Sequence, residues 1–143
     1  MLGLEAMPLR IEDYALLGDC HTAALVGRDG SIDWLCLPRF DSGACFSALL
    51  GAPGNGRWLL APSAPPKRVT RAYREGTLVL DTTFETDDAA VVVTDFMPLR
   101  DQVPHVVRCV RGLRGQMAMR SELVIRFDYG SIVPWVRRDD IQR

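Results

Sequence analysis

The sequence predicts an all-β fold, an antiparallel β-sandwich with one short helix. Short runs of apolar and β-branched residues recur along the chain, tight-turn residues separate them, and hardly any segment has a helical period. The chain has 143 residues, of which 48% are apolar and 24% charged. This ordinary globular composition is sufficient for one hydrophobic core.

The first structured element is expected near Ile11, because Met1 to Arg10 shows no periodicity and is predicted to be a loose lead-in. Two strands follow, Thr22 to Val26 and Ser31 to Leu37. Arg28-Asp29-Gly30 lies between them and is a turn signal, so the two strands are predicted to form a β-hairpin.

After the hairpin, Pro38 lacks the N–H that a strand ladder needs, so the chain is expected to leave the sheet there. Asp41 or Ser42 is then predicted to cap a short helix, Ala44 to Leu50, that stops at Gly51.

The second half of the chain is predicted to consist almost entirely of strands. The last of them shows the clearest alternation, with Met119, Leu123, Ile125 and Phe127 on the face that we expect in the core. The segments expected to be strands are Arg57 to Ala61, Val69 to Tyr73, Thr77 to Phe84, Ala89 to Phe96, His105 to Leu113 and Met117 to Phe127.

The domain is expected to span residues 11–138, followed by a divergent tail, residues 139–143. The apolar stretch Ile132 to Val136 lies close to the end of the sequence, which is unlike a natural domain edge. We therefore expect a truncated domain that supplies only part of a larger sandwich, a partial super-sandwich. Such a domain would expose strand edges, so self-association is predicted.

The charges exclude one class of partner, because 17 basic and 18 acidic residues are spread along the chain without the basic stripe that nucleic acid requires. No segment has the length and hydropathy of a membrane span or a secretory leader, so no membrane partner is expected and the cytoplasm is the predicted location. His21 and His105 stand apart from any ligand pattern, and we predict no metal and no cofactor.

The four cysteines, Cys20, Cys36, Cys45 and Cys109, have wide spacings and lie in or beside apolar runs. They are predicted to be reduced and mostly buried, with an oxidised pair as the alternative.

Chemistry is concentrated in and after the hairpin. Asp33 and Trp34 are neighbours in a strand, so they point to opposite faces, one toward the core and the other toward solvent or a partner. The next loop brings together Arg39, Phe40 and Asp41, a polar pair and a ring of the kind on which sugar faces stack. Two interpretations remain open: the pair contacts a ligand or partner, or it only pins the loop to its own domain.

The same region resembles the start of trehalase-like and glucoamylase-like enzymes of glycoside hydrolase family 15. The motifs that carry the resemblance are Ile11-Glu12-Asp13-Tyr14, Leu17-Gly18-Asp19, Gly30-Ser31-Ile32-Asp33-Trp34-Leu35 and Pro38-Arg39-Phe40-Asp41-Ser42. Weaker resemblance continues through Asn55-Gly56-Arg57-Trp58 and Thr94-Asp95-Phe96-Met97-Pro98 to about Arg138.

The resemblance implies an N-terminal β-sandwich domain that supports a catalytic helical barrel, in which two glutamates carry out inverting hydrolysis of an α-glucoside. That barrel is absent from this sequence, so no catalytic residue is assigned. Trp34, Arg39, Phe40 and Asp41 are the predicted substrate or interdomain contacts. The alternatives are a freestanding carbohydrate-binding β-sandwich module and an inactive truncated fragment.

Overall fold

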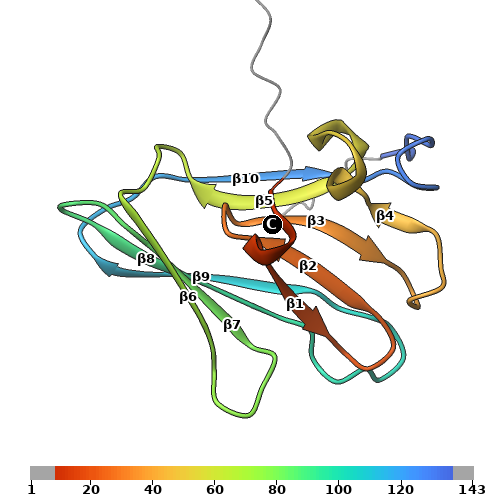
Figure 1. Ribbon diagram of the computed structural model, residues 1–143, viewed down its shortest axis with the longest axis horizontal. Helices are drawn as coiled ribbons and strands as arrows, with labels where there is room; N and C mark the ends of the chain where they lie inside the picture. Colours follow the sequence, from red (N-terminus) through yellow and green to blue (C-terminus); the bar gives the residue numbers. More distant parts are fainter. Residues whose placement is uncertain (1–8, 137–143) are drawn as a thin grey trace, which may run out of the picture.

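The computed structural model describes residues 9–136 and shows two antiparallel β-sheets packed face to face (Figure 1). The divergent tail predicted for residues 139–143 and most of the lead-in lie outside the described residues. The larger sheet has the order β1-β2-β3-β5-β10, with the short β4 also paired to β3, and the smaller sheet has the order β6-β7-β8-β9. The strands of the larger sheet are β1 Tyr14–Gly18, β2 Ala23–Gly27, β3 Ser31–Cys36, β4 Ala44–Phe46, β5 Arg57–Pro62 and β10 Met119–Val124. Those of the smaller sheet are β6 Arg68–Tyr73, β7 Leu80–Glu85, β8 Ala90–Phe96 and β9 Val107–Arg114.

The predicted all-β sandwich is thus confirmed, and so is the hairpin, which is formed by β2 and β3. Gly30 makes its turn possible, since it has a φ of 86° and a Cβ at this position would overlap the Leu60 carbonyl. β3 ends at Cys36, just before Pro38, where the chain was expected to leave the sheet.

The predicted helix from Ala44 to Leu50 is wrong. Residues Ala44–Phe46 form β4, which pairs with β3 through Leu35↔Phe46 and Cys36↔Ala44, and all three of its residues are buried. Only Ala48–Leu50 is helical, as a single 3-10 turn. Contacts with β3 therefore override the local helix signal. Two further 3-10 turns occur, Ile11–Asp13 and Pro53–Asn55.

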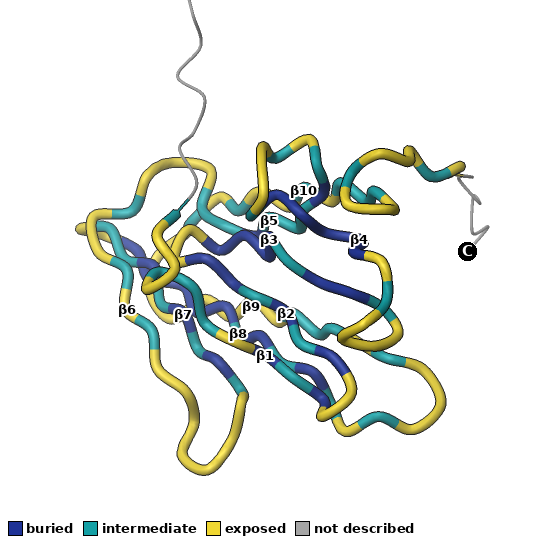
Figure 2. Tube along the Cα trace, turned by 45° about the vertical axis from the view of Figure 1, so that its right-hand side comes forward, coloured by how far each residue is buried: buried dark blue, intermediate teal, exposed yellow. Residues whose placement is uncertain are grey.

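The core lies between the sheets, where the buried residues gather (Figure 2). One cluster includes Leu17, Val26 and Ile32 from the larger sheet together with Leu80, and a second joins Leu60 to Phe84 and Val93. Among the longer strands, burial is strongest along β3 and β8, which lie inside their sheets and have neighbours on both sides.

The last strand is less buried than its alternation predicted. Leu123 is 54% exposed and Phe127 47% exposed, so they do not form part of the closed core. The reason is position: β10 is the edge strand of the larger sheet, and the smaller sheet ends at β9. An open apolar groove of about 330 Å³ remains here, lined by Trp58, Leu123, Ile125 and Phe127 among others.

Candidate functional site

The candidate site is the loop of residues 37–43, which connects β3 to β4 and begins with a cis Leu37–Pro38 bond. The backbone N–H of Phe40 donates a hydrogen bond to the carbonyl of His21 at 3.0 Å, tying the loop to the β1–β2 turn. Within the loop, the Ser42 N–H donates to the Arg39 carbonyl at 3.1 Å, and the Arg39 N–H donates to Ser42 Oγ at 3.1 Å. These bonds hold the three central residues in one defined conformation.

The side chains of Arg39 and Asp41 form a two-point ion pair, with Nε–Oδ1 at 2.9 Å and the second guanidinium nitrogen to Oδ2 at 3.2 Å. The pair is open to solvent, since the two side chains are 68% and 72% exposed. Phe40, between them, is 62% exposed. A charged pair and an aromatic ring are therefore presented outward from a fixed backbone.

A shallow hollow of about 360 Å³ lies beside the loop and is lined by Cys20, His21, Arg39, Phe40 and Asp41. The structure thus brings together three of the four predicted contact residues. Sequence reasoning missed Cys20 and His21, whose place in the hollow follows from the β1–β2 register and from the bond to Phe40.

The β1–β2 turn is itself held by a buried charge, the carboxylate of Asp19. Its Oδ1 accepts hydrogen bonds from the N–H groups of His21 and Thr22, both at 2.9 Å, and its Oδ2 accepts one from Arg100 Nε at 2.8 Å. Burial raises the pKa of this carboxyl, but these bonds outweigh it and leave the pKa below its usual value. Asp19 therefore holds the backbone of the turn that contributes Cys20 and His21 to the hollow.

Trp34 does not line this hollow. It is half-buried and lies with its ring centroid 6.1 Å from that of Tyr129, in a tilted arrangement. Its neighbour Asp33 points the other way and is buried, accepting hydrogen bonds from the Ser31 hydroxyl and from the Tyr14 hydroxyl at 2.7 Å. Burial and this bond to Asp33 raise the pKa of Tyr14. Of the two residues, Asp33 is the interior one.

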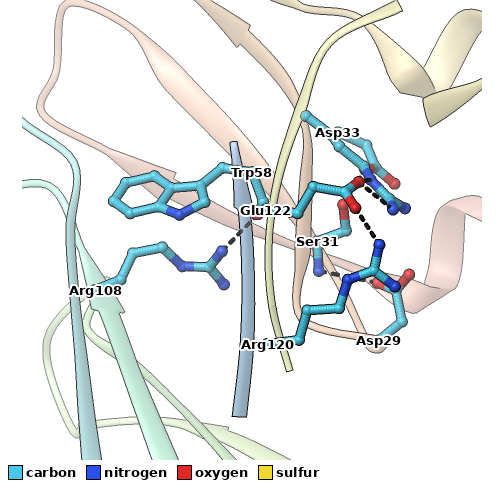
Figure 3. A network of polar contacts seen from close by, with 8 residues as sticks. Asp29, Ser31, Asp33, Trp58, Arg108, Arg120 and Glu122 are labelled. Carbon is cyan, nitrogen blue, oxygen red and sulfur yellow. Dashed lines mark hydrogen bonds and ion pairs between the residues drawn. The ribbon is translucent and has the colours of Figure 1, made fainter. Parts of the chain in front are cut away.

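A second buried ion pair lies within the smaller sheet, and its arginine also reaches the larger sheet. Arg108 from β9 pairs with Asp95 from β8 at 2.8 Å, and the two side chains are 0% and 1% exposed. The same guanidinium donates to the carbonyls of Trp58 at 2.6 Å and Gly30 at 2.8 Å, and it stacks over the Trp58 ring (Figure 3). Arg108 thereby fixes the smaller sheet against β5 and the hairpin turn.

The hollow presents a thiol, an imidazole, a guanidinium, a carboxylate and an aromatic ring. Among the described residues that line it, Asp41 has the only carboxylate, and this group is already paired with Arg39. Acid and base catalysis of glycoside hydrolysis needs two separately acting carboxyls. Within residues 9–136, no three His, Cys, Asp or Glu side chains gather into a potential metal site. None of the helices in that range is long or apolar enough to cross a membrane.

The fold is a β-sandwich domain whose loop of residues 37–43 exposes an ion pair and an aromatic ring. The family described as "Trehalase-like, N-terminal" matches residues 1–140, and the chain belongs to this family.

Similar proteins include the trehalases of Mycolicibacterium smegmatis, Thermoplasma volcanium and Mycobacterium tuberculosis. The first is 40% identical over 85 residues, covering 59% of this chain and 13% of that protein. The second is 32% identical over 136 residues, covering 91% and 22%, and the third is 38% identical over 138 residues, covering 83% and 20%. The chain therefore spans about a fifth or less of the length of these relatives. No solved structure matches it at a significant level.

Proposed function

We propose that this chain is the N-terminal accessory domain of a trehalase-like α-glucoside hydrolase, and that the loop of residues 37–43 docks on the catalytic domain beside the sugar site. The family match over residues 1–140 supports the role of an N-terminal domain. The observation that carries the docking role is the Arg39–Asp41 pair, which is exposed although its loop is tied down by backbone hydrogen bonds.

In this role Arg39 uses the donors that Asp41 leaves free to bind carbonyl or hydroxyl oxygens across the interface. Asp41 holds the guanidinium plane in place, and Phe40 offers an apolar face to a neighbouring side chain or to the sugar ring. The catalytic partner is proposed to be a helical barrel of the glucoamylase-like, inverting kind, which supplies both catalytic carboxyls. The hollow has one carboxylate only, in keeping with a supporting role.

The test is a chimera in which this chain replaces the matching N-terminal segment of the Mycolicibacterium smegmatis trehalase. Arg39→Ala and Asp41→Ala in the chimera are expected to lower kcat/KM for trehalose by tenfold or more while the melting temperature changes little. Arg68→Ala is the matched control, because the exposed Arg68 lies in the other sheet, where it pairs with Glu85 between β6 and β7. Equal, small effects from all three substitutions would contradict the proposal.

We also propose that the domain works in the cytoplasm. All four cysteines are free thiols, which suits a reducing compartment. Cys36 and Cys45 are buried as predicted, whereas Cys20 and Cys109 are exposed, so the prediction of mostly buried cysteines is wrong for these two. Fractionation of cells that produce the chain, followed by detection with an antibody, is expected to place it in the cytoplasmic fraction. Its recovery from the membrane or extracellular fraction would contradict this location.

A further inference from the structure

The edges of the two sheets differ in how far they are protected, within the part of the chain that the structure describes. The edge of β1 is capped, because the Tyr73 hydroxyl accepts from the Leu16 N–H at 2.8 Å and donates to the Leu16 carbonyl at 3.0 Å. β9 exposes Arg111 and Arg114 and contains no acidic residue, so two such strands would repel each other.

The edge strand β10 lacks these protections. It pairs with β5 in an unbroken register over Met119–Val124, without a bulge, and its sequence contains no proline. A regular edge strand of this kind presents unpaired N–H and carbonyl groups to another chain. Its free edge is distinct from the candidate site, because the loop of residues 37–43 lies away from β10 in Figure 1.

We propose that two copies of this chain associate through antiparallel pairing of their β10 strands, with Ser121 of one copy opposite Ser121 of the other. The larger sheets would then form one continuous sheet across a two-fold axis, which is the usual symmetry of a homodimer. This inference is independent of the proposed function, since it rests on the edge strand β10 and not on the loop between β3 and β4.

The charges on the outer face of β10 complement themselves in this register. Arg120 lies opposite Glu122 of the second copy, and Glu122 lies opposite the second Arg120. Within one copy these two side chains already form an ion pair, and Glu122 also binds Arg57 at 2.7 Å (Figure 3). Pairing therefore joins two existing clusters of opposite charges into one network across the axis.

The inner face of β10 is complementary in the same register. Met119 lies opposite Leu123 of the second copy, and the two-fold axis generates a second, identical pair. Leu123 is 54% exposed and Met119 half-buried, so both have apolar surface to lose. Burial of that surface adds a hydrophobic contribution to the backbone hydrogen bonds.

The two neighbouring antiparallel registers are less favourable than the one centred on Ser121. Because directly opposite residues share a face, the register can shift only in steps that keep outer side chains opposite outer ones. One such step places Arg120 opposite Arg120 of the second copy, and the step in the other direction places Glu122 opposite Glu122 of the second copy. Both bring like charges together, so the register centred on Ser121 is selected by charge.

Sedimentation velocity on the purified chain over a range of concentrations tests the association. We expect a monomer–dimer equilibrium that Glu122→Arg and Arg120→Glu each abolish, because each gives β10 two like charges. A mixture of the two variants is expected to recover the dimer, as is the doubly swapped chain. Circular dichroism and melting temperature show that each variant is folded, and Arg111→Glu in β9 is the control that leaves association unchanged.

Cysteine cross-linking tests the register. In a background with Cys20→Ser and Cys109→Ser, Ser121→Cys is expected to give a covalent dimer on mild oxidation, because the Cα atoms of opposite residues lie about 4.5–5.5 Å apart, within the range that a disulfide spans. Position 123 lies on the same face, but in this register it is distant from position 123 of the second copy. Leu123→Cys is therefore expected to give no covalent dimer under the same treatment. A chain that is monomeric at every concentration, a mixture that fails to recover the dimer, or a dimer that only Arg111→Glu disrupts would overturn the proposal.

Discussion

Replacement of Arg108 by alanine is expected to destabilise the domain strongly. The substitution leaves the carboxylate of Asp95 without its partner at a position where the side chain is 1% exposed. It also removes the donors to the carbonyls of Trp58 and Gly30. Breaking a buried ion pair by removing one partner costs about 3–5 kcal/mol in free energy of unfolding. The two backbone carbonyls that are left without a donor favour the upper end of this range.

A loss of this size is a large share of the total stability of a domain, which is about 5–15 kcal/mol. For a chain of this length each kcal/mol lowers the melting temperature by about 2–4 °C, so a decrease of roughly 6–20 °C is expected. Urea unfolding followed by far-ultraviolet circular dichroism gives the free energy, and a thermal scan on the same samples gives the melting temperature.

The matched control is Arg68→Ala. Arg68 also belongs to an ion pair, but the guanidinium lies 3.8 Å from Glu85 and its side chain is 72% exposed. Such surface pairs contribute at most about 1 kcal/mol. If Arg108→Ala and Arg68→Ala lower the free energy of unfolding equally, then Arg108 does not hold the two sheets together and the reasoning from burial is refuted.

Three further predictions concern titration and reactivity. The pKa of Asp19 is lowered in the folded state, so the unfolded chain binds more protons in acid, and the stability that this group contributes above about pH 4 is lost as the pH falls. Arg100→Met is expected to weaken this dependence of the free energy of unfolding on pH, measured by urea unfolding; an unchanged dependence would refute the prediction. The pKa of Tyr14 is raised, so absorbance at alkaline pH is expected to show one late-ionising phenol that Tyr14→Phe removes; ionisation of all tyrosines near their ordinary pKa would count against it. Burial raises the pKa of the Cys45 thiol to about 11. Ellman's reagent at pH 8 is therefore expected to modify the exposed Cys20 quickly and Cys45 only after unfolding, and equal rates of modification would contradict the burial of Cys45.

Local patterns predicted the hairpin and the approximate positions of the strands of the second half. The turn Asp29-Gly30 demands a residue with positive φ, and the alternation on either side of it specifies two strands, so both signals agree. The prediction of a helix from Ala44 to Leu50 was wrong because the secondary structure of its first three residues is determined by pairing with β3. Asp41 and Ser42, the expected helix caps, bind Arg39 and its backbone instead.

The site was only partly predictable. Arg39, Phe40 and Asp41 are close in sequence, so their proximity follows from one loop, whereas Trp34 lies on a strand face directed elsewhere. The ion pair of Asp19 with Arg100 connects residues separated by 81 positions. Such a pair depends on how the sheets pack, which no spacing in the sequence specifies.

Hydrogen exchange tests the central claim, that the loop of residues 37–43 docks on a catalytic domain. The amide exchange rates of this loop are compared between the isolated chain and the chimera with the Mycolicibacterium smegmatis trehalase. We expect that exchange in the loop slows in the chimera, while the β7–β8 turn at Thr86 to Ala89 exchanges at the same rate in both. Identical loop exchange in the isolated chain and in an active chimera would contradict the account.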